Sequence, residues 1–109
     1  MNARLVIGFA LLAASVLLLD GCESTPAIAP PVTASFLRAG LRQHADGPTL
    51  AEGRRLYLNR CIQCHALPHV TKYDPERLTA IVAKMAGRAN LSEQQHDAVL
   101  KYLLTTRAQ

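Results

Sequence analysis

The stretch that decides the fold is RRLYLNRCIQCHALPH, residues 54–69. Cys61 and Cys64 stand three positions apart, and His65 follows the second cysteine directly. On a helical turn, this spacing brings both thiols to one side of the backbone. An interpretation of the chain has to explain why these three side chains are placed together.

C-x-x-C-H is the attachment motif of c-type haem, in which each thiol adds to one vinyl group of the porphyrin. His65 would then lie under the iron as its proximal ligand. Covalent attachment also retains a haem on a chain that is too small to enclose it. The motif therefore predicts one haem c, held by Cys61 and Cys64 and ligated by His65.

Other uses of paired cysteines explain less of the motif. A thioredoxin-like redox pair needs an α/β pattern, and no strand-rich βαβ pattern is present. A zinc site needs a second pair of ligands, but only His69 lies nearby and no further cysteine pair follows. A disulfide across so short a loop would leave His65 without a role.

Residues 1–21 resemble a bacterial lipoprotein signal peptide. Arg4 precedes an uncharged apolar run, residues 5–19, that is shorter than the about 20 residues needed to cross a membrane. Gly21 and Cys22 follow, as in a lipobox, although Asp20 departs from that pattern. The resemblance implies acyl chains on Cys22, and several acyl chains anchor a protein stably where one is marginal.

The alternatives for Cys22 are a free cysteine after an ordinary signal peptide and an uncleaved apolar anchor. An unpaired thiol is a liability in an oxidising compartment, which favours lipidation. We therefore expect a periplasm-facing protein anchored to a bacterial membrane. Glu23, where an aspartate would signal retention in the inner membrane, favours the outer membrane. Haem attachment of this type also takes place outside the cytoplasm.

Residues 22–47 are expected to form a tether and an irregular lead-in. Three prolines in residues 23–36 favour extended chain, and the short apolar piece at residues 35–40 is interpreted as a turn of helix that docks loosely. The net charge of +4 is unchanged when residues 1–21 are removed, because one basic and one acidic residue are lost. This charge is weak and is not interleaved with aromatic residues, so we expect no nucleic-acid partner.

Residues 48–109 are expected to form the folded domain. Thr49 and Glu52 match the capping box at the start of a first helix. Leu50, Gly53 and Tyr57 share one face of that helix. A glycine inside a helix costs about 1 kcal/mol relative to alanine, so Gly53 suggests the close approach of another helix.

Two further helices are expected. The last should begin at Ser92 as N-cap, with an apolar stripe that includes Leu91, Val99, Tyr102 and Leu103. The middle helix should carry Pro75 in its first turn and end near Gly87 or Asn90. Its apolar face combines Leu78, Ile81, Val82 and Met85.

From Thr49 to Thr106 the sequence resembles the class I cytochrome c family. The resemblance implies an all-α fold with about three helices around one covalently attached haem, the first and last helices crossing. In the family, a glycine and an aromatic residue of the first helix meet an aliphatic and an aromatic residue of the last. Gly53, Tyr57, Val99 and Tyr102 stand at those positions.

The resemblance also implies Met85 as the distal iron ligand, since a thioether there raises the reduction potential and suits electron transfer. The separation of Met85 from His65 is short for the family. A compact subset has a similar arrangement, usually with a tryptophan where Leu78 stands. The alternatives are that Met85 only fills the core, or that another histidine binds the iron. These histidines are His44, His69 and His96, of which His96 is expected to face solvent.

Two minor roles follow from the resemblance. The carbonyl of Pro68 would accept a hydrogen bond from the ring of His65. Several basic side chains are candidates for the haem edge and its propionates, unless they are simply solvated: Arg54, Arg55, Arg60, Lys84 and Arg88.

Two axial ligands would leave the iron no position for a substrate, so we expect an electron carrier without catalytic residues. It would pass single electrons between redox proteins such as a dehydrogenase, an oxidase or another cytochrome, or serve as the electron-transfer subunit of an oxidoreductase. The alternative is a five-coordinate haem protein that binds or reduces peroxide or nitric oxide.

Overall fold

The structure, a computed structural model, describes residues 28–61 and 69–109. The expected signal peptide, Cys22, Cys64, His65 and Pro68 lie outside these residues. The described chain contains helices and no strand, which confirms the all-α class. Its α-helices are α2 (Ala34–Gly40), α3 (Gly47–Leu56), α4 (Pro75–Arg88) and α5 (Glu93–Arg107). Within the two described ranges, no helix has both the length and the apolar character to cross a membrane.

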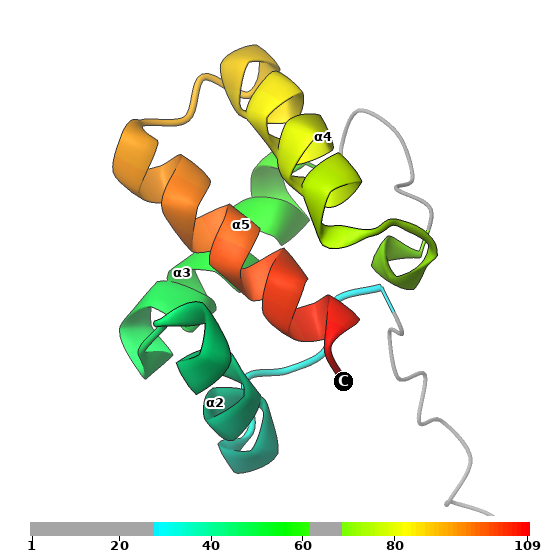
Figure 1. The fold of residues 1–109 in the computed structure, drawn as a ribbon. Helices are drawn as coiled ribbons and strands as arrows, with labels where there is room; N and C mark the ends of the chain where they lie inside the picture. The colour runs from blue at the N-terminus through cyan, green and yellow to red at the C-terminus, as the bar shows by residue number, and fades with distance from the viewer. Residues whose placement is uncertain (1–27, 62–68) are drawn as a thin grey trace, which may run out of the picture.

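The crossing of α3 and α5 is the centre of the fold (Figure 1). The helices approach so closely at Gly53 that an added Cβ would collide with the carbonyl oxygen of Ala98. The same Cβ would lie 2.7 Å from the Cβ of Tyr102. The expectation that Gly53 marks a close helix contact is thus confirmed. The expected contact between the first and last helices of the domain is also confirmed, and these helices are α3 and α5.

Three aromatic rings fill the crossing. Tyr102 of α5 lies with its ring centroid 6.2 Å from that of Tyr57 and 5.3 Å from that of Phe36. These separations are typical of stabilising aromatic pairs. All three side chains are buried, and Val99 beside them is also buried.

The lead-in is more ordered than the sequence suggested. Helix α2 begins at Thr33, whose hydroxyl accepts a hydrogen bond from the Phe36 N–H, and the 3₁₀ turn η1 (Leu41–Gln43) continues it. Helix α2 packs against α5 through Phe36, which is 1% exposed. The burial of this ring against Tyr102 explains why residues 34–43 form a packed element.

The segment before α2 is also held to the fold. The Arg54 side chain donates to the carbonyl oxygens of Ala29 and Pro30, at 3.3 and 3.2 Å. The Tyr102 hydroxyl donates to the Pro30 carbonyl at 2.8 Å. Ala29 is fully buried. The chain therefore joins the α3–α5 crossing from residue 29 onward.

The first helix of the expected domain begins earlier than its predicted capping box. Its N-cap is Asp46, whose carboxylate accepts from the Thr49 N–H at 2.9 Å. Hydrogen bonding by the Thr49 side chain, followed by this bond to its backbone, lowers the pKa of Asp46. The prediction that Thr49 and Glu52 cap the helix is therefore wrong. Glu52 instead forms an ion pair with Arg55 at 2.7 Å.

Helix α4 has the expected start and end. Pro75 lies in its first turn after the N-cap Asp74. After the helix, Asn90 adopts a left-handed conformation with φ 52°. The Leu91 N–H then bonds to the Ala86 carbonyl at 3.0 Å, and the Asn90 N–H bonds to the Gly87 carbonyl at 3.3 Å. This pair of bonds is the Schellman motif, and it turns the chain toward α5.

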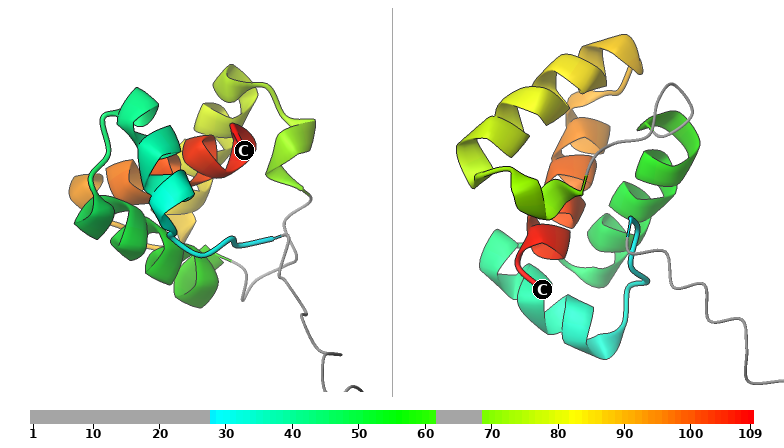
Figure 2. Two further views of the ribbon diagram at one scale, coloured as in Figure 1. Left: turned by 90° about the horizontal axis from the view of Figure 1, so that it is seen from below. Right: turned by 90° about the vertical axis from the view of Figure 1, so that its right-hand side faces the viewer.

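Helix α5 begins at Ser92, as predicted. The Ser92 hydroxyl accepts from the Gln95 N–H at 3.2 Å, while the Gln95 side chain accepts from the Ser92 N–H at 3.0 Å. These reciprocal bonds form a capping box. Figure 2 shows α5 running between α2 on one side and α4 on the other, so one helix organises both.

Candidate functional site

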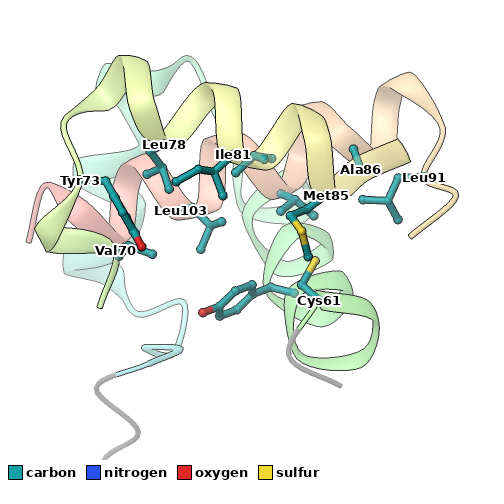
Figure 3. Close-up of a pocket in the computed structure, with 12 residues that line it drawn as sticks. Cys61, Val70, Tyr73, Leu78, Ile81, Met85, Ala86, Leu91 and Leu103 are labelled. Carbon is teal, nitrogen blue, oxygen red and sulfur yellow. The ribbon is translucent and has the colours of Figure 1, made fainter. Parts of the chain in front are cut away.

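An apolar hollow lies between the end of α3, one face of α4 and the side of α5 (Figure 3). It contains about 440 Å³ of space not filled by protein atoms, part of it open to solvent. The lining is contributed by the three helices and by the connections around α4, and consists of Tyr57, Cys61, Val70, Tyr73, Leu78, Ile81, Val82, Met85, Ala86, Leu91, Val99 and Leu103.

The middle helix contributes its predicted apolar face to this hollow. Leu78 and Val82 are buried, while Ile81 and Met85 are partly exposed at its surface. The connections add Val70 and Tyr73, which periodicity did not identify, and Leu91, which the sequence placed on the apolar stripe of the last helix. Val70 belongs to the 3₁₀ turn η3 (Val70–Lys72), and Tyr73 directly follows that turn.

Cys61 reaches the hollow because α3 ends in a π-helical turn, η2 (Tyr57–Cys61). In an ideal α-helix, eight residues rotate by about 800°, which would carry Cys61 roughly 80° away from the face of Gly53. A π turn has more residues per turn and reduces this drift. Cys61 accordingly remains on the inward side and is 5% exposed.

Met85 faces Cys61 across the hollow. In Figure 3 the Met85 side chain extends from α4 toward the Cys61 side chain at the end of α3. A hydrogen bond near these two residues links the end of α3 to the end of α4. The Arg60 guanidinium donates to the Ala89 carbonyl at 3.3 Å. Arg60 directly precedes Cys61, and Ala89 caps the helix that carries Met85. Cys61 and Met85, both predicted as site residues from the sequence, thus line the same hollow.

The opposite end of the hollow is fixed by a second link. The Arg107 side chain, in the last turn of α5, donates to the Tyr73 carbonyl at 2.6 Å. This bond ties the η3–α4 connection to α5 and places the Tyr73 ring at the edge of the hollow. Both ends of α4 are thus attached to the neighbouring elements by arginine–carbonyl bonds.

The hollow favours neutral groups. Among the lining residues that the structure describes, none is Asp, Glu, Lys, Arg or His. Burial raises the pKa of Tyr57 to about 12. An ionised group placed there would be costly without a partner, whereas a flat apolar group would replace water at apolar walls. The apolar lining would therefore suit a flat apolar group better than a charged one.

The histidines proposed as alternative ligands lie elsewhere. His44 and His69 are exposed, and neither they nor His96 line the hollow. His96 is half-buried and not fully solvent-facing as expected, and its buried Nε2 atom has no hydrogen-bond partner among the described residues. His96 precedes Val99 by three positions and Leu103 by seven, so it lies on the stripe of α5 that lines the hollow. That spacing was the sequence signal for the partial burial of His96.

The basic residues proposed for the haem edge have different surroundings. Arg54 is engaged with the segment before α2, and Arg55 with Glu52. Arg60 donates to Ala89 as described above, while Lys84 and Arg88 are exposed on α4. Among the described residues, no group of three or more His, Cys, Asp or Glu side chains is arranged to hold a metal ion.

No family model matches the chain, and no curated protein or solved structure shows significant similarity to it.

Proposed function

We propose that this protein is a monohaem c-type cytochrome, anchored by lipid, that passes single electrons between redox proteins of the periplasm. One observation carries the proposal. Cys61, the first residue of the C-x-x-C-H motif, lies buried at an apolar hollow, and Met85 faces it from the opposite helix.

Four residues would hold the haem. Cys61 and Cys64 would attach it through thioether bonds, and His65 and Met85 would occupy the two axial positions of the iron. The bound haem supplies a one-electron couple between ferrous and ferric iron. The apolar residues of α4 and α5 would exclude water from its faces. Because both axial positions would be occupied by protein, no position would remain for a substrate, and we propose an electron carrier and not an enzyme.

Met85 is favoured as the distal ligand because it lines the hollow, whereas no histidine among the described residues does. His96 is the rival to test, since its buried Nε2 atom has no hydrogen-bond partner within the part of the chain that the structure describes. Oxidised cytochromes with methionine ligation show a weak sulfur-to-iron charge-transfer band in the near infrared. We expect this band to survive His96→Ala and to disappear in Met85→Ala. The reverse pattern would assign the position to His96.

Attachment itself is tested by the absorption spectrum in both redox states, together with haem staining after denaturing electrophoresis. Covalently bound haem stays with the polypeptide, while a non-covalent haem is lost. A colourless exported protein, with no added mass on the cysteine pair, would reject the proposal. Carbon monoxide separates carrier from ligand-binding protein: ready binding to the reduced form at neutral pH would indicate a five-coordinate iron, with Met85 acting only in packing.

The lipid anchor is the second part of the proposal. It is supported by the lipobox-like sequence before Cys22 and by the need for an exported chain in haem attachment of this type. Mass spectrometry of the N-terminal peptide should show acyl chains on Cys22. A Cys22→Ser variant should lose membrane association while it keeps its haem spectrum.

A further inference from the structure

The exposed large apolar residues of the described chain are confined to one region. These residues are Ile28, Leu37 and Leu41, which are 44%, 37% and 69% exposed. Single exposed apolar residues are ordinary on protein surfaces. Here, however, all of them lie within residues 28–41, next to the proposed lipid attachment site in the sequence.

Helix α2 and its first following turn present a surface that is both apolar and cationic. Phe36, Ala39 and Gly40 point into the fold. The outward residues are Ala34, Leu37, Arg38, Leu41 and Arg42, all exposed, and we call this set the α2 face. Leu37 and Leu41 are one helical turn apart, and so are the two arginines. Apolar residues beside basic ones are the composition of helices that lie at a membrane surface.

No acidic side chain in residues 28–61 or 69–109 forms an ion pair with the α2 face. Arg38 and Arg42 form no ion pair and no side-chain hydrogen bond within the described part of the chain. Residues 28–45 contain no aspartate or glutamate. Two uncompensated arginines in this position match the phosphates of anionic lipids.

The attachment of residues 29 and 30 limits how far this face can move from Cys22. Ala29 is fully buried, and the Pro30 carbonyl accepts hydrogen bonds from Arg54 and Tyr102. Only the seven peptide steps from Cys22 to Ala29 remain, which can span at most about 25 Å. If residues 22–47 formed an extended tether, as the sequence predicted, the domain could lie several times farther from Cys22 than this. A lipid on Cys22 would therefore keep the N-terminal edge of the domain beside the bilayer.

We propose that the α2 face rests on the headgroups of an anionic lipid membrane and orients the domain there. The inference rests on the lipid attachment included in the proposed function. The arginines bind lipid phosphates, and Leu37 and Leu41 enter the interface. Residues 28–33 and α2 run along the lower edge of the domain in Figure 1, while α4 lies at the opposite end. This orientation directs α4 and the hollow it lines away from the membrane, toward soluble redox partners.

The test uses the full lipoprotein in vesicles made of equal parts phosphatidylglycerol and phosphatidylcholine, doped with a nickel-chelating lipid. A nitroxide is attached at Ala34→Cys in the α2 face or at Ala83→Cys, an exposed alanine on α4. Nickel at the headgroups relaxes a nearby nitroxide. Comparing vesicles with and without nickel cancels any relaxation caused within the protein. We expect several-fold stronger nickel-dependent relaxation at position 34 than at position 83.

Charge variants provide the matched control. The double variant Arg38→Gln and Arg42→Gln should lose most of the contrast, whereas Lys84→Gln with Arg88→Gln on α4 should keep it. Replacing phosphatidylglycerol by phosphatidylcholine should weaken the contrast as the arginine variant does. Equal relaxation at both labels in lipidated protein overturns the inference. If spin–spin broadening at position 34 accompanies that result, the face is covered by a second copy of the chain.

Two readings on the same sample separate this inference from the proposed function. A mass without acyl chains on Cys22 would remove the anchor and the membrane orientation together, and the haem spectrum would still decide the electron-carrier proposal. A lipidated, haem-containing protein with equal relaxation at both labels would reject the orientation alone.

Discussion

Replacing Gly53 by alanine should separate the two central helices. The added Cβ would overlap the Ala98 carbonyl oxygen and lie 2.7 Å from the Tyr102 Cβ, and backbone atoms cannot rotate away. Overpacking of this kind typically costs about 1–3 kcal/mol, and a collision with backbone belongs at the upper end. Alanine regains about 1 kcal/mol of helix propensity. We therefore expect Gly53→Ala to lower the free energy of unfolding by about 2 kcal/mol.

Urea unfolding followed by far-ultraviolet circular dichroism measures this loss. The midpoint should fall at an unchanged slope, and Tm should fall by about 8–16 °C for a domain of this size. Gly87→Ala is the matched control, because a Cβ at Gly87 would meet nothing within 4 Å. That variant should gain about 0.5–1 kcal/mol from helix propensity. A Gly53→Ala protein as stable as the Gly87→Ala protein would refute the close contact between α3 and α5.

Three further changes test individual contacts. Tyr102→Phe removes the 2.8 Å hydrogen bond to the Pro30 carbonyl and should cost about 0.5–1.5 kcal/mol in urea unfolding, an unchanged midpoint being the contrary result. Ser92→Ala removes the N-cap of α5 and should cost about 1 kcal/mol, while the neighbouring exposed Glu93→Ala should cost less. Burial raises the pKa of Tyr57 to about 12, whereas a tyrosine in the unfolded chain has a pKa of about 10. The stability that this shift contributes is therefore complete below about pH 10 and is lost as the pH rises toward about 12. The free energy of unfolding of Tyr57→Phe should therefore fall less steeply between about pH 10 and about pH 12 than that of the wild type. Parallel pH profiles of the two proteins would contradict this expectation.

The sequence predicted the parts of the fold that local pattern determines. Gly53 and Tyr57 share a helix face with the right spacing, and a glycine there is costly unless another helix needs the space. The caps at Ser92 and Asn90 depend on residues only a few positions away, so they were also accessible. The Thr49 cap was wrong because Asp46 offers a competing carboxylate three residues earlier, and both patterns look similar in sequence.

The packed lead-in could not be predicted because its cause is distant in sequence. Residues 34–43 have little periodicity of their own, and prolines precede them. Their helix is stabilised by the contact of Phe36 with Tyr102, which lies on the last helix. The lining of the hollow was predictable only in part for a similar reason. Met85 was predicted from the helical spacing of apolar residues in α4, whereas Val70 and Tyr73 belong to a connection that has no such spacing.

The π-helical turn at residues 57–61 has a consequence for how this chain tolerates changes in length. A π turn accommodates one residue more than α-helical winding would, so deleting a residue between Tyr57 and Cys61 would let the segment relax to an ordinary helix. The first thiol would then follow Gly53 by seven residues, a rotation of about 700° that returns it to within roughly 20° of the Gly53 face. The deletion would preserve the cysteine pair and its spacing, and the first thiol would stay beside the hollow. Loss of the π turn without a deletion would instead turn that thiol away from the Gly53 face and toward water.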